Sequence, residues 1–354
     1  MKLLKETLAE IKPLDARVMD KVRSRLDSLT KPAGSLGCLE EMVIQFAGIT
    51  GREKPEIPRK CMVLTAADHG VARLGISAYP RETTMQMLRN YLLSKGAAAN
   101  VLADHCGADL VVVDMGVAGD SSTIPGLLQR KIAPGTQDFT KGPAMTRAQA
   151  VSALETGIAL VRAQVKKGYR LFTVGEMGIG NTTASAAILA AFTGMTAEAV
   201  TGRGTGISDQ RLSRKRDAVR AALQMNKPDP RDGIDVLAKV GGFELGGLAG
   251  VMLGAAAMRS MVVVDGFNAG AAAMVAQALQ PGCGQYLLGS HISAEEGHRG
   301  MIQVLGLHPC IDLGLRLGEA VGASLVANFL DAAIKLLHEM ATFEDANVTK
   351  SAEE

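Results

Sequence analysis

The sequence predicts an α/β protein with a parallel sheet, helices on both faces of the sheet, and a small helical lobe built from the N- and C-terminal segments. Short, nearly uninterrupted apolar segments alternate with helical patterns along the middle of the chain, which is typical of parallel strands buried on both faces. The two ends of the chain show helical periodicity instead. The 354 residues, 47% of them hydrophobic, are enough to bury a large core.

The two ends are expected to supply the helices of the lobe. Residues 14–29 carry apolar side chains at helical spacing, namely Leu14, Val18, Val22, Leu26 and Leu29. A second helix is expected after the break at 31–34, with Ser35 as its N-cap. Residues 322 to about 340 predict one long C-terminal helix.

The chain therefore divides into N-terminal lobe helices at 1–55, an α/β domain at 56–310, and a glutamate-bearing loop with the last lobe helix at 311–354. The α/β domain holds five strand candidates, at 61–66, 109–115, 170–175, 260–265 and 285–289. In parallel sheets, ligands bind outside the carboxyl ends of the strands. Polar or glycine residues stand at those ends: Asp68, His69, Gly70, Asp114, Glu176, Asp265, Gly266, Ser290 and His291. We expect them to share one crevice.

Residues 174–183 run from a strand through a glycine-dense loop into an alanine-rich helix. Gly178 and Gly180 allow backbone N–H groups to approach an anion, and the helix start at Asn181 and Thr182 presents unpaired donors. The loop nearly matches a P-loop, but Asn181 occupies the lysine position, which disfavours triphosphate hydrolysis. Glu176 repels an anion, so it indicates a nearby cation or a proton to be removed. Tight strand-to-helix packing remains the alternative.

A second glycine cluster lies at 201–206 and precedes a helix that carries Arg211, Arg214, Lys215 and Arg216. Backbone amides, a helix start and basic side chains together predict a monophosphate site. A loop followed by a solvated basic helix face is the alternative. Near the C-terminus, Glu319 stands among apolar residues and glycines. Burial would raise its pKa and make it a stronger base at neutral pH, although a helix N-terminal carboxylate is also consistent with the pattern.

Composition disfavours several other classes of function. The net charge is only +2, from 38 basic and 36 acidic residues, so the excess of positive charge typical of a nucleic-acid binder is missing. Aromatic residues make up 3% of the chain and there is no Trp, which also disfavours stacking on nucleic-acid bases. The five cysteines show no metal or disulfide spacing. His291 and His298 do not form a known zinc motif. The N-terminus has no signal-peptide core, and the apolar run at 245–258 is shorter than the ~20 residues of a bilayer span. We expect a cytoplasmic protein without membrane, metal or cofactor.

Taken together, these motifs resemble the nicotinate-nucleotide:5,6-dimethylbenzimidazole phosphoribosyltransferase family. The resemblance covers nearly the whole chain and rests on residues 29–37, 67–71, 175–183, 202–206, 265–267, 290–291 and 316–319. It implies a homodimeric, Rossmann-like transferase that uses nicotinate mononucleotide and a benzimidazole-type base as substrates. The products would be α-ribazole 5′-phosphate and nicotinate, in the nucleotide-loop branch of cobalamin biosynthesis.

The resemblance also implies roles for individual residues. Glu319 matches the catalytic base and Glu176 a second active-site acid. The residues expected at the donor phosphate and ribose are Gly178, Gly180, Asn181, Thr182, Gly202, Gly204, Thr205, Gly206, Lys215 and Ser290. Those expected around the acceptor base are Ser77, Tyr79, Gln86, Met177 and Leu317.

One departure from the family pattern follows the expected base. A small Gly-Thr or Gly-Ser pair is expected there, and the chain has Ala320 and Val321. We expect these bulkier side chains to narrow or reshape the aromatic pocket, which leaves the acceptor open to substituted or unsubstituted benzimidazoles and other azoles. Two other classes of function also remain: a degenerate P-loop protein that binds a triphosphate with Mg²⁺, and a non-catalytic binding module.

Overall fold

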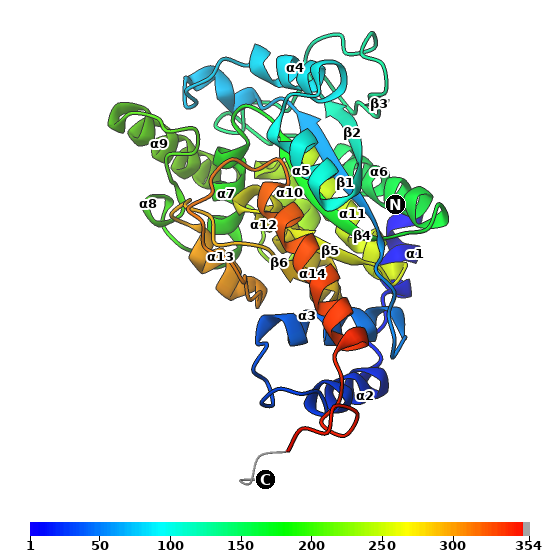
Figure 1. The fold of residues 1–354 in the computed structure, drawn as a ribbon. Coiled ribbons are helices and arrows are strands. Elements are labelled where there is room, and N and C mark those ends of the chain that lie inside the picture. Colours follow the sequence, from blue (N-terminus) through cyan, green and yellow to red (C-terminus); the bar gives the residue numbers. More distant parts are fainter. Residues whose placement is uncertain (350–354) are drawn as a thin grey trace.

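The structure is a computed structural model that describes residues 1–349, and it confirms the predicted α/β class (Figure 1). One six-stranded sheet, parallel throughout, has the strand order β3-β2-β1-β4-β5-β6, which is the Rossmann order. The strands are β1 Arg59–Ala67, β2 Ala108–Gly116, β3 Leu128–Gln129, β4 Tyr169–Met177, β5 Met261–Val264 and β6 Leu287–Gly289. Only β3 was not predicted, because two residues are too short to produce a strand pattern.

The α-helices of the described chain are α1 Lys2–Glu10, α2 Ala16–Asp27, α3 Cys38–Thr50, α4 Glu82–Arg89, α5 Ala98–Cys106, α6 Arg147–Lys166, α7 Asn181–Thr193, α8 Ala197–Val200, α9 Asp209–Asn226, α10 Gly233–Val240, α11 Phe243–Ala257, α12 Phe267–Leu279, α13 His298–Leu305 and α14 Val321–Glu339. Short 3₁₀ helices span η1 Gly70–Leu74 and η3 Pro281–Tyr286, and a π-helical turn spans η2 Asn90–Ser94.

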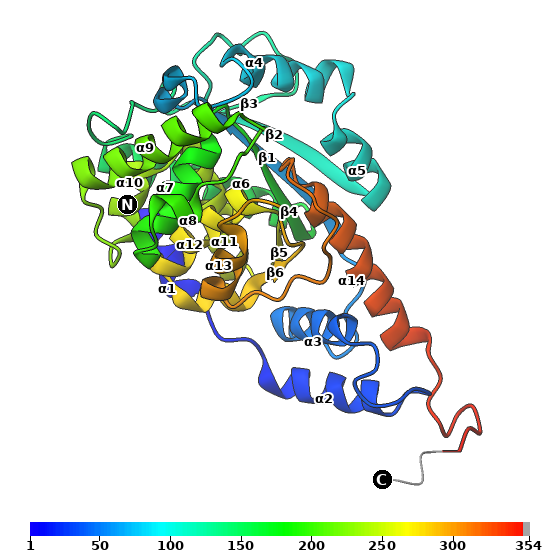
Figure 2. The same ribbon diagram turned by 90° about the vertical axis from the view of Figure 1, so that its left-hand side faces the viewer.

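Helices cover both faces of the sheet. One face packs against α11 and α12, with α6 outside α11, and the other packs against α5 and α14 (Figure 2). Glycines allow α6 and α11 to approach closely. A Cβ at Gly157 would lie 2.0 Å from the carbonyl oxygen of Gly247, and a Cβ at Gly250 would lie 2.1 Å from that of Leu154. The small-residue composition of α11 is therefore required by backbone-to-backbone packing.

The helical lobe consists of α2, α3 and the far end of α14, which stand together at one end of the molecule (Figure 2). The helix predicted at 14–29 is α2, whose N-cap Asp15 accepts a hydrogen bond from the Val18 N–H at 3.1 Å. The N-cap of α3 is Gly37 and not the predicted Ser35, because the chain makes a further turn before the helix begins. The helix α1, which lies within the range assigned to the lobe, packs instead against α6 and α11.

Among residues 1–349, α14 is the one helix whose length and apolar composition would permit a membrane span. It lies against α3, α5 and the sheet strands β4 and β5, so most of its apolar side chains are part of the protein core. Its first turn brings the Glu319 loop over the carboxyl end of β4, where a Cβ at Gly175 would lie 2.4 Å from the backbone nitrogen of Ala320.

Candidate active site

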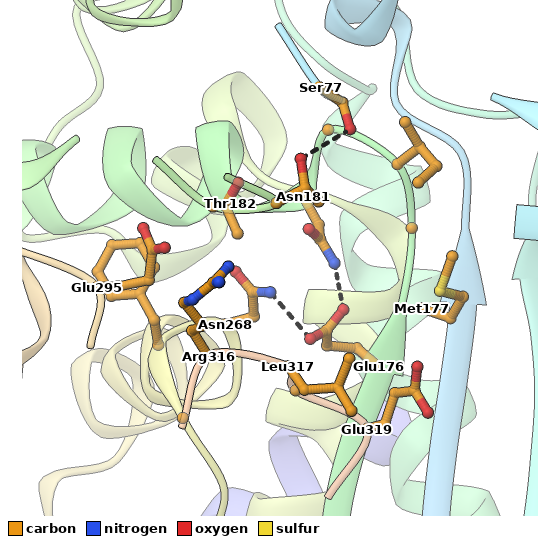
Figure 3. A pocket seen from close by; sticks show the side chains of 18 of the residues that line it. Ser77, Glu176, Met177, Asn181, Thr182, Asn268, Glu295, Arg316, Leu317 and Glu319 are labelled. Atoms are coloured by element: carbon orange, nitrogen blue, oxygen red, sulfur yellow. Dashed lines mark hydrogen bonds between the residues drawn. The ribbon is translucent and has the colours of Figure 1, made fainter. Parts of the chain in front are cut away.

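A cavity of about 370 Å³ opens outside the carboxyl ends of β4 and β5 (Figure 3). Its walls come from the β4–α7 and β5–α12 loops, the segments around 76–87, 204–205, 291–295 and 316–319, and helix α9. The cavity brings together most of the residues predicted from the sequence: Ser77, Tyr79, Glu176, Met177, Gly178, Gly180, Asn181, Thr182, Gly204, Thr205, Lys215, Leu317 and Glu319. Segments far apart in the chain therefore form one site.

The β4–α7 loop presents the N-terminus of α7 to the cavity. Gly180 is the N-cap of α7 with φ +100°, and no side chain caps this helix. A Cβ at Gly178 would lie 2.4 Å from the carbonyl oxygen of Ala67 on β1, so only glycine allows the loop to pack this closely. The N–H groups of Asn181 and Thr183 bond to the carbonyl oxygens of Gly178 and Gly180 at 3.1 Å. The helix dipole and the remaining N–H groups of the loop and first turn make this end of α7 a candidate anion site.

Lys215 joins this loop to the second glycine cluster. Its side chain is almost fully buried, and Nζ donates hydrogen bonds to Thr182 Oγ1 at 2.8 Å and to the Gly202 carbonyl oxygen at 3.1 Å. Burial lowers the pKa of Lys215 to about 8, although the negative charge of Glu295 opposes this shift. A third N–H of the ammonium group remains for an anion bound at the α7 N-terminus.

Glu176 is held by two amide side chains. Asn268 Nδ2 donates to Glu176 Oε1 at 2.9 Å, and Asn181 Nδ2 donates to Oε2 (Figure 3). Asn268 is itself oriented by the hydroxyl of Ser185, which lies 2.7 Å from its Oδ1. Both carboxyl oxygens of Glu176 are therefore fixed in the cavity wall.

The environment of Glu176 favours its protonated form when the cavity is empty. Burial raises its pKa to about 8, and the carboxylates of Glu244, Asp265 and Glu319 add to the rise, while the hydrogen bond from Asn268 lowers it. A positive charge in the cavity would bring this pKa down again. Glu176 is therefore suited to stabilise a cationic ligand or a developing positive charge.

Glu319 lies on a loop with an unusual backbone. Three consecutive residues have left-handed conformations: Gly318 with φ +82°, Glu319 with φ +59° and Ala320 with φ +60°. A Cβ at Gly318 would lie 2.6 Å from Glu176 Oε1, so this glycine brings the loop against the other carboxyl group. Left-handed backbone at two non-glycine residues costs free energy and is typical of functional sites.

The carboxyl group of Glu319 is buried, and its Oε2 has no hydrogen-bond partner within residues 1–349. Burial raises the pKa of Glu319, while Tyr91 and the backbone at Ala99 partly offset the shift and the charge of Asp265 adds to it. A carboxylate with a free oxygen and a raised pKa is a competent proton acceptor near neutral pH. The raised pKa predicted from the sequence is thus confirmed.

The two residues after Glu319 do not narrow the cavity, contrary to the prediction. Neither Ala320 nor Val321 lines it. Ala320 is fully buried against Gly175, and Val321 begins α14. The effect of having Ala320 at this position is on the backbone. Ala320 has a left-handed conformation, which glycine adopts without strain and alanine does not.

We expect Ala320→Gly to raise the free energy of unfolding by about 0.5–1 kcal/mol, because relief of the left-handed strain exceeds the added entropy of the unfolded chain. Denaturant unfolding measures this. Ala323→Gly in the first turns of α14 is the matched control, and it should instead lose about 1 kcal/mol. Equal losses in the two variants would show that the Ala320 backbone carries no strain.

Several residues predicted for the site do not line the cavity. Gln86 is on the exposed face of α4, while Thr83 and Met87 of the same helix face inward. Ser290 is fully buried, with Oγ 3.0 Å from the Asp265 carbonyl oxygen and 2.9 Å from His291 Nδ1. Gly202 and Gly206 flank the part of the loop that reaches the cavity.

Two predicted strand ends serve the fold instead of the crevice. His69 Nε2 lies 2.7 Å from Glu244 Oε1 in a fully buried pair beneath the glycine loop, and Asp68 accepts a hydrogen bond from the Ala118 N–H at 2.8 Å. Asp114 accepts from the backbone N–H groups of residues 116 and 117 at the end of β2. The hydrogen bonds of these side chains stabilise the strand ends, and the side chains do not line the cavity. Asp265, Gly266 and His291 do line it.

Sequence reasoning did not assign site roles to Asn268, Glu295 or Arg316, all of which line the cavity (Figure 3). Asn268 stands three residues after Asp265, and Arg316 stands three before Glu319, so both lie inside or beside recognised motifs. In the sequence, Glu295 stands out only by its place between His291 and His298, a pair that does not form a known zinc motif. Within residues 1–349 no group of three or more His, Cys, Asp or Glu side chains is placed to hold a metal ion.

A Rossmann-type sheet whose carboxyl edge joins an anion site to two proton-binding carboxyl groups defines an α/β group-transfer enzyme. Residues 11–348 match the family model described as phosphoribosyltransferase. The nicotinate-nucleotide–dimethylbenzimidazole phosphoribosyltransferase of Chloroflexus aggregans is 52% identical over 353 residues, covering 100% of both chains. The protein of that name from Geobacter metallireducens is 50% identical over 354 residues, again covering 100% of both.

A solved structure shares the whole fold. The crystal structure described as the nicotinate-nucleotide–dimethylbenzimidazole phosphoribosyltransferase of Thermus thermophilus superposes with a TM-score of 0.90 at 43% identity, covering 96% of this chain and 100% of that one. The chain belongs to the nicotinate-nucleotide–dimethylbenzimidazole phosphoribosyltransferase family. The resemblance inferred from the sequence motifs is confirmed.

Proposed function

We propose that the protein transfers the 5-phosphoribosyl group of nicotinate mononucleotide to a ring nitrogen of 5,6-dimethylbenzimidazole or a related base. The products are α-ribazole 5′-phosphate and nicotinate, in the nucleotide-loop branch of cobalamin biosynthesis. The observation that carries the proposal is the placement of Glu176 and Glu319, two carboxyl groups with raised pKa, between an anion site and an apolar wall of one cavity. The names of the full-length relatives support it.

The donor phosphate fits the anion site formed by Lys215, Thr182 and the N-terminus of α7. As the bond between the ribose carbon and the pyridinium nitrogen stretches, the electron pair leaves with nicotinate and the ribose gains positive charge. Glu176, fixed by its two amide partners, is placed to stabilise that charge as a carboxylate. The cationic donor itself favours this ionised form.

The acceptor base fits the apolar side of the cavity, which includes Tyr79, Met87, Met177 and Leu317. One ring nitrogen attacks the ribose carbon with its lone pair, and the other nitrogen then loses its proton. Glu319, which lines the cavity and whose Oε2 has no protein partner within the described residues, is the acceptor for that proton. The reaction therefore breaks the bond between the ribose and nicotinate, forms the bond between the ribose and the base, and moves one proton from the base to Glu319.

Incubation of the protein with nicotinate mononucleotide and 5,6-dimethylbenzimidazole, followed by chromatography, tests the proposal. Release of nicotinate with formation of α-ribazole 5′-phosphate is expected. Binding of both ligands without release would favour a non-catalytic module. Binding of a nucleoside triphosphate that depends on Mg²⁺ would favour the degenerate P-loop alternative.

Turnover is expected to be unchanged by EDTA, because the donor carries one phosphate that backbone amides and Lys215 can hold without a metal. Initial rates with and without added Mg²⁺ measure this. Activity that disappears with EDTA and returns with Mg²⁺ would contradict the proposed mechanism.

We further propose a cytoplasmic homodimer. All five cysteines are free thiols, which suits a reducing compartment. Val101 and Phe329 are exposed apolar side chains on α5 and α14, which pack against each other, and Leu93 is a third on η2, just before α5 in the chain. A second chain would cover them. Light scattering should give twice the mass of one chain, and a monomer at micromolar concentration would contradict the dimer.

A further inference from the structure

Glu295 lies in the wall of the cavity between β6 and α13, on the side of the anion site. Figure 3 shows it away from Glu319, with Arg316 and Asn268 between them in the view. The residue is only 8% exposed, and Oε2 is buried without a hydrogen-bond partner in the described chain. A buried carboxylate oxygen without a donor is costly, and at a residue that lines the cavity a bound ligand can relieve that cost.

The backbone around Glu295 is held in a fixed turn. The Glu295 N–H donates to Ser293 Oγ at 3.3 Å, and the His298 N–H donates to the Glu295 carbonyl oxygen at 3.0 Å. The carboxyl group also rests against Gly202, where a Cβ would lie 2.5 Å from Oε2. The glycine at 202 therefore makes room for Glu295, which gives this motif position a second purpose beside its carbonyl bond to Lys215.

Glu295 is not part of an ion pair within residues 1–349. Lys215 Nζ bonds to Thr182 and to the Gly202 carbonyl oxygen, and it does not come within 4.0 Å of a Glu295 oxygen. The neighbouring Glu296 is the carboxylate that pairs with Arg216, at 3.5 Å. Glu295 thus lines the cavity beside the anion site, and its Oε2 remains an acceptor without a donor in the described chain.

A ligand group that meets the Glu295 carboxylate must be a hydrogen-bond donor. A phosphate dianion offers only acceptors and would be repelled by a carboxylate. Both oxygens of Glu176 are already bonded to amides. Next to the phosphate, a mononucleotide offers the hydroxyl groups of its ribose, which are donors. We propose that Glu295 accepts a hydrogen bond from a ribose hydroxyl of the donor nucleotide and thereby selects a ribonucleotide over its deoxy counterpart.

This inference rests on the proposed function, because it requires a phosphoribosyl donor in the cavity. Calorimetry without acceptor base tests it with nicotinate mononucleotide and with its 2′-deoxy and 3′-deoxy analogues. The wild-type protein should bind the ribonucleotide roughly 10–100-fold more tightly than one of the two analogues, as expected for a hydrogen bond to a charged group. Glu295→Ala should weaken binding of the ribonucleotide and leave that analogue unaffected, so that the ratio falls to about one.

Glu296→Ala is the matched control, because it removes an adjacent but exposed carboxylate, and it should keep the wild-type ratio. Inorganic phosphate should bind Glu295→Ala as tightly as it binds the wild type, or more tightly, since a nearby negative charge is removed. Weaker phosphate binding would overturn the inference and assign Glu295 to keeping Lys215 charged. Equal losses for the ribonucleotide and both analogues would also overturn it.

The two proposals fail in distinguishable ways. A wild-type protein that releases no nicotinate when both substrates are present overturns the proposed transferase reaction alone. Calorimetry with ribose 5-phosphate and 2-deoxyribose 5-phosphate, and with the 3-deoxy sugar phosphate, then decides whether Glu295 contacts a hydroxyl. An unchanged preference for the hydroxyl in Glu295→Ala would overturn the role of Glu295 while leaving the transferase reaction in place.

Discussion

Glu319→Gln is expected to slow transfer by about 10²–10⁴-fold while leaving the fold and donor binding intact. The amide keeps the size of the side chain and one acceptor oxygen, but it cannot take the proton from the attacking base. Because Glu319 is buried in the wild type, a neutral amide should not lower thermal stability. Single-turnover rates and donor affinity, measured on the same preparation, separate the chemical step from binding.

The pH profile provides an independent check on Glu319. A proton acceptor works in its ionised form, and burial raises the pKa of Glu319. The wild-type rate should therefore fall as the pH drops through a value above the ordinary range of a glutamate, and Glu319→Gln should lack this acidic limb. Glu176→Gln is the comparison variant. If it abolishes the acidic limb while Glu319→Gln keeps the wild-type rate and profile, the base is Glu176.

Lys215→Met is expected to weaken nicotinate mononucleotide binding by roughly 10–100-fold and to leave the acceptor affinity nearly unchanged. A charge-assisted contact to phosphate is worth about 1.5–3 kcal/mol, and methionine preserves most of the buried stem. Calorimetry with each ligand measures the two affinities. Arg214→Ala, which removes an exposed cation one residue away, is the control and should leave donor binding almost unchanged.

The pKa of Lys215 adds a pH dependence to donor binding. Burial lowers this pKa to about 8, so the empty site loses its ammonium charge as the pH rises through that value. Donor affinity of the wild type should decline above about pH 8, and the methionine variant should show no such decline. Equal losses of donor and acceptor affinity in Lys215→Met would instead mean that the lysine supports the fold.

The glycine loop at 174–183 and the strand segments could be predicted because their signals are local. Apolar runs bounded by helical patterns predict buried parallel strands, and all five predicted strands are present. Glycines followed by a helix start predict an anion site wherever such a loop occurs, and α7 begins at Asn181 as that pattern requires. The order of the motifs along the chain was also sufficient to indicate the family.

The hydrogen-bond partners of the buried carboxyl groups could not be predicted from the sequence, because they come from residues far apart in the chain. Asn268 holds Glu176 across 92 positions of sequence, and no local pattern links them. Gln86 is exposed because of how α4 is rotated against the rest of the protein. The helical spacing shows which residues share a face of α4, but only the packing of the helix shows which face meets the cavity. The same applies to His69, which the fold pairs with Glu244 beneath the loop.

By itself, then, the sequence determined the α/β class and the glycine loop that precedes α7, because secondary structure and glycine chemistry follow from residues that are near one another in the chain. It also singled out Glu176 and Glu319, which both line the cavity. Only the tertiary structure decided the raised pKa of Glu176, the left-handed backbone at Ala320 and the unpartnered oxygen of Glu295. Each of these features depends on burial and on neighbours that the packing of the loops above β4, β5 and β6 brings together. Burial and hydrogen bonds between distant residues exist only in the folded chain, so no local pattern in the sequence reveals them.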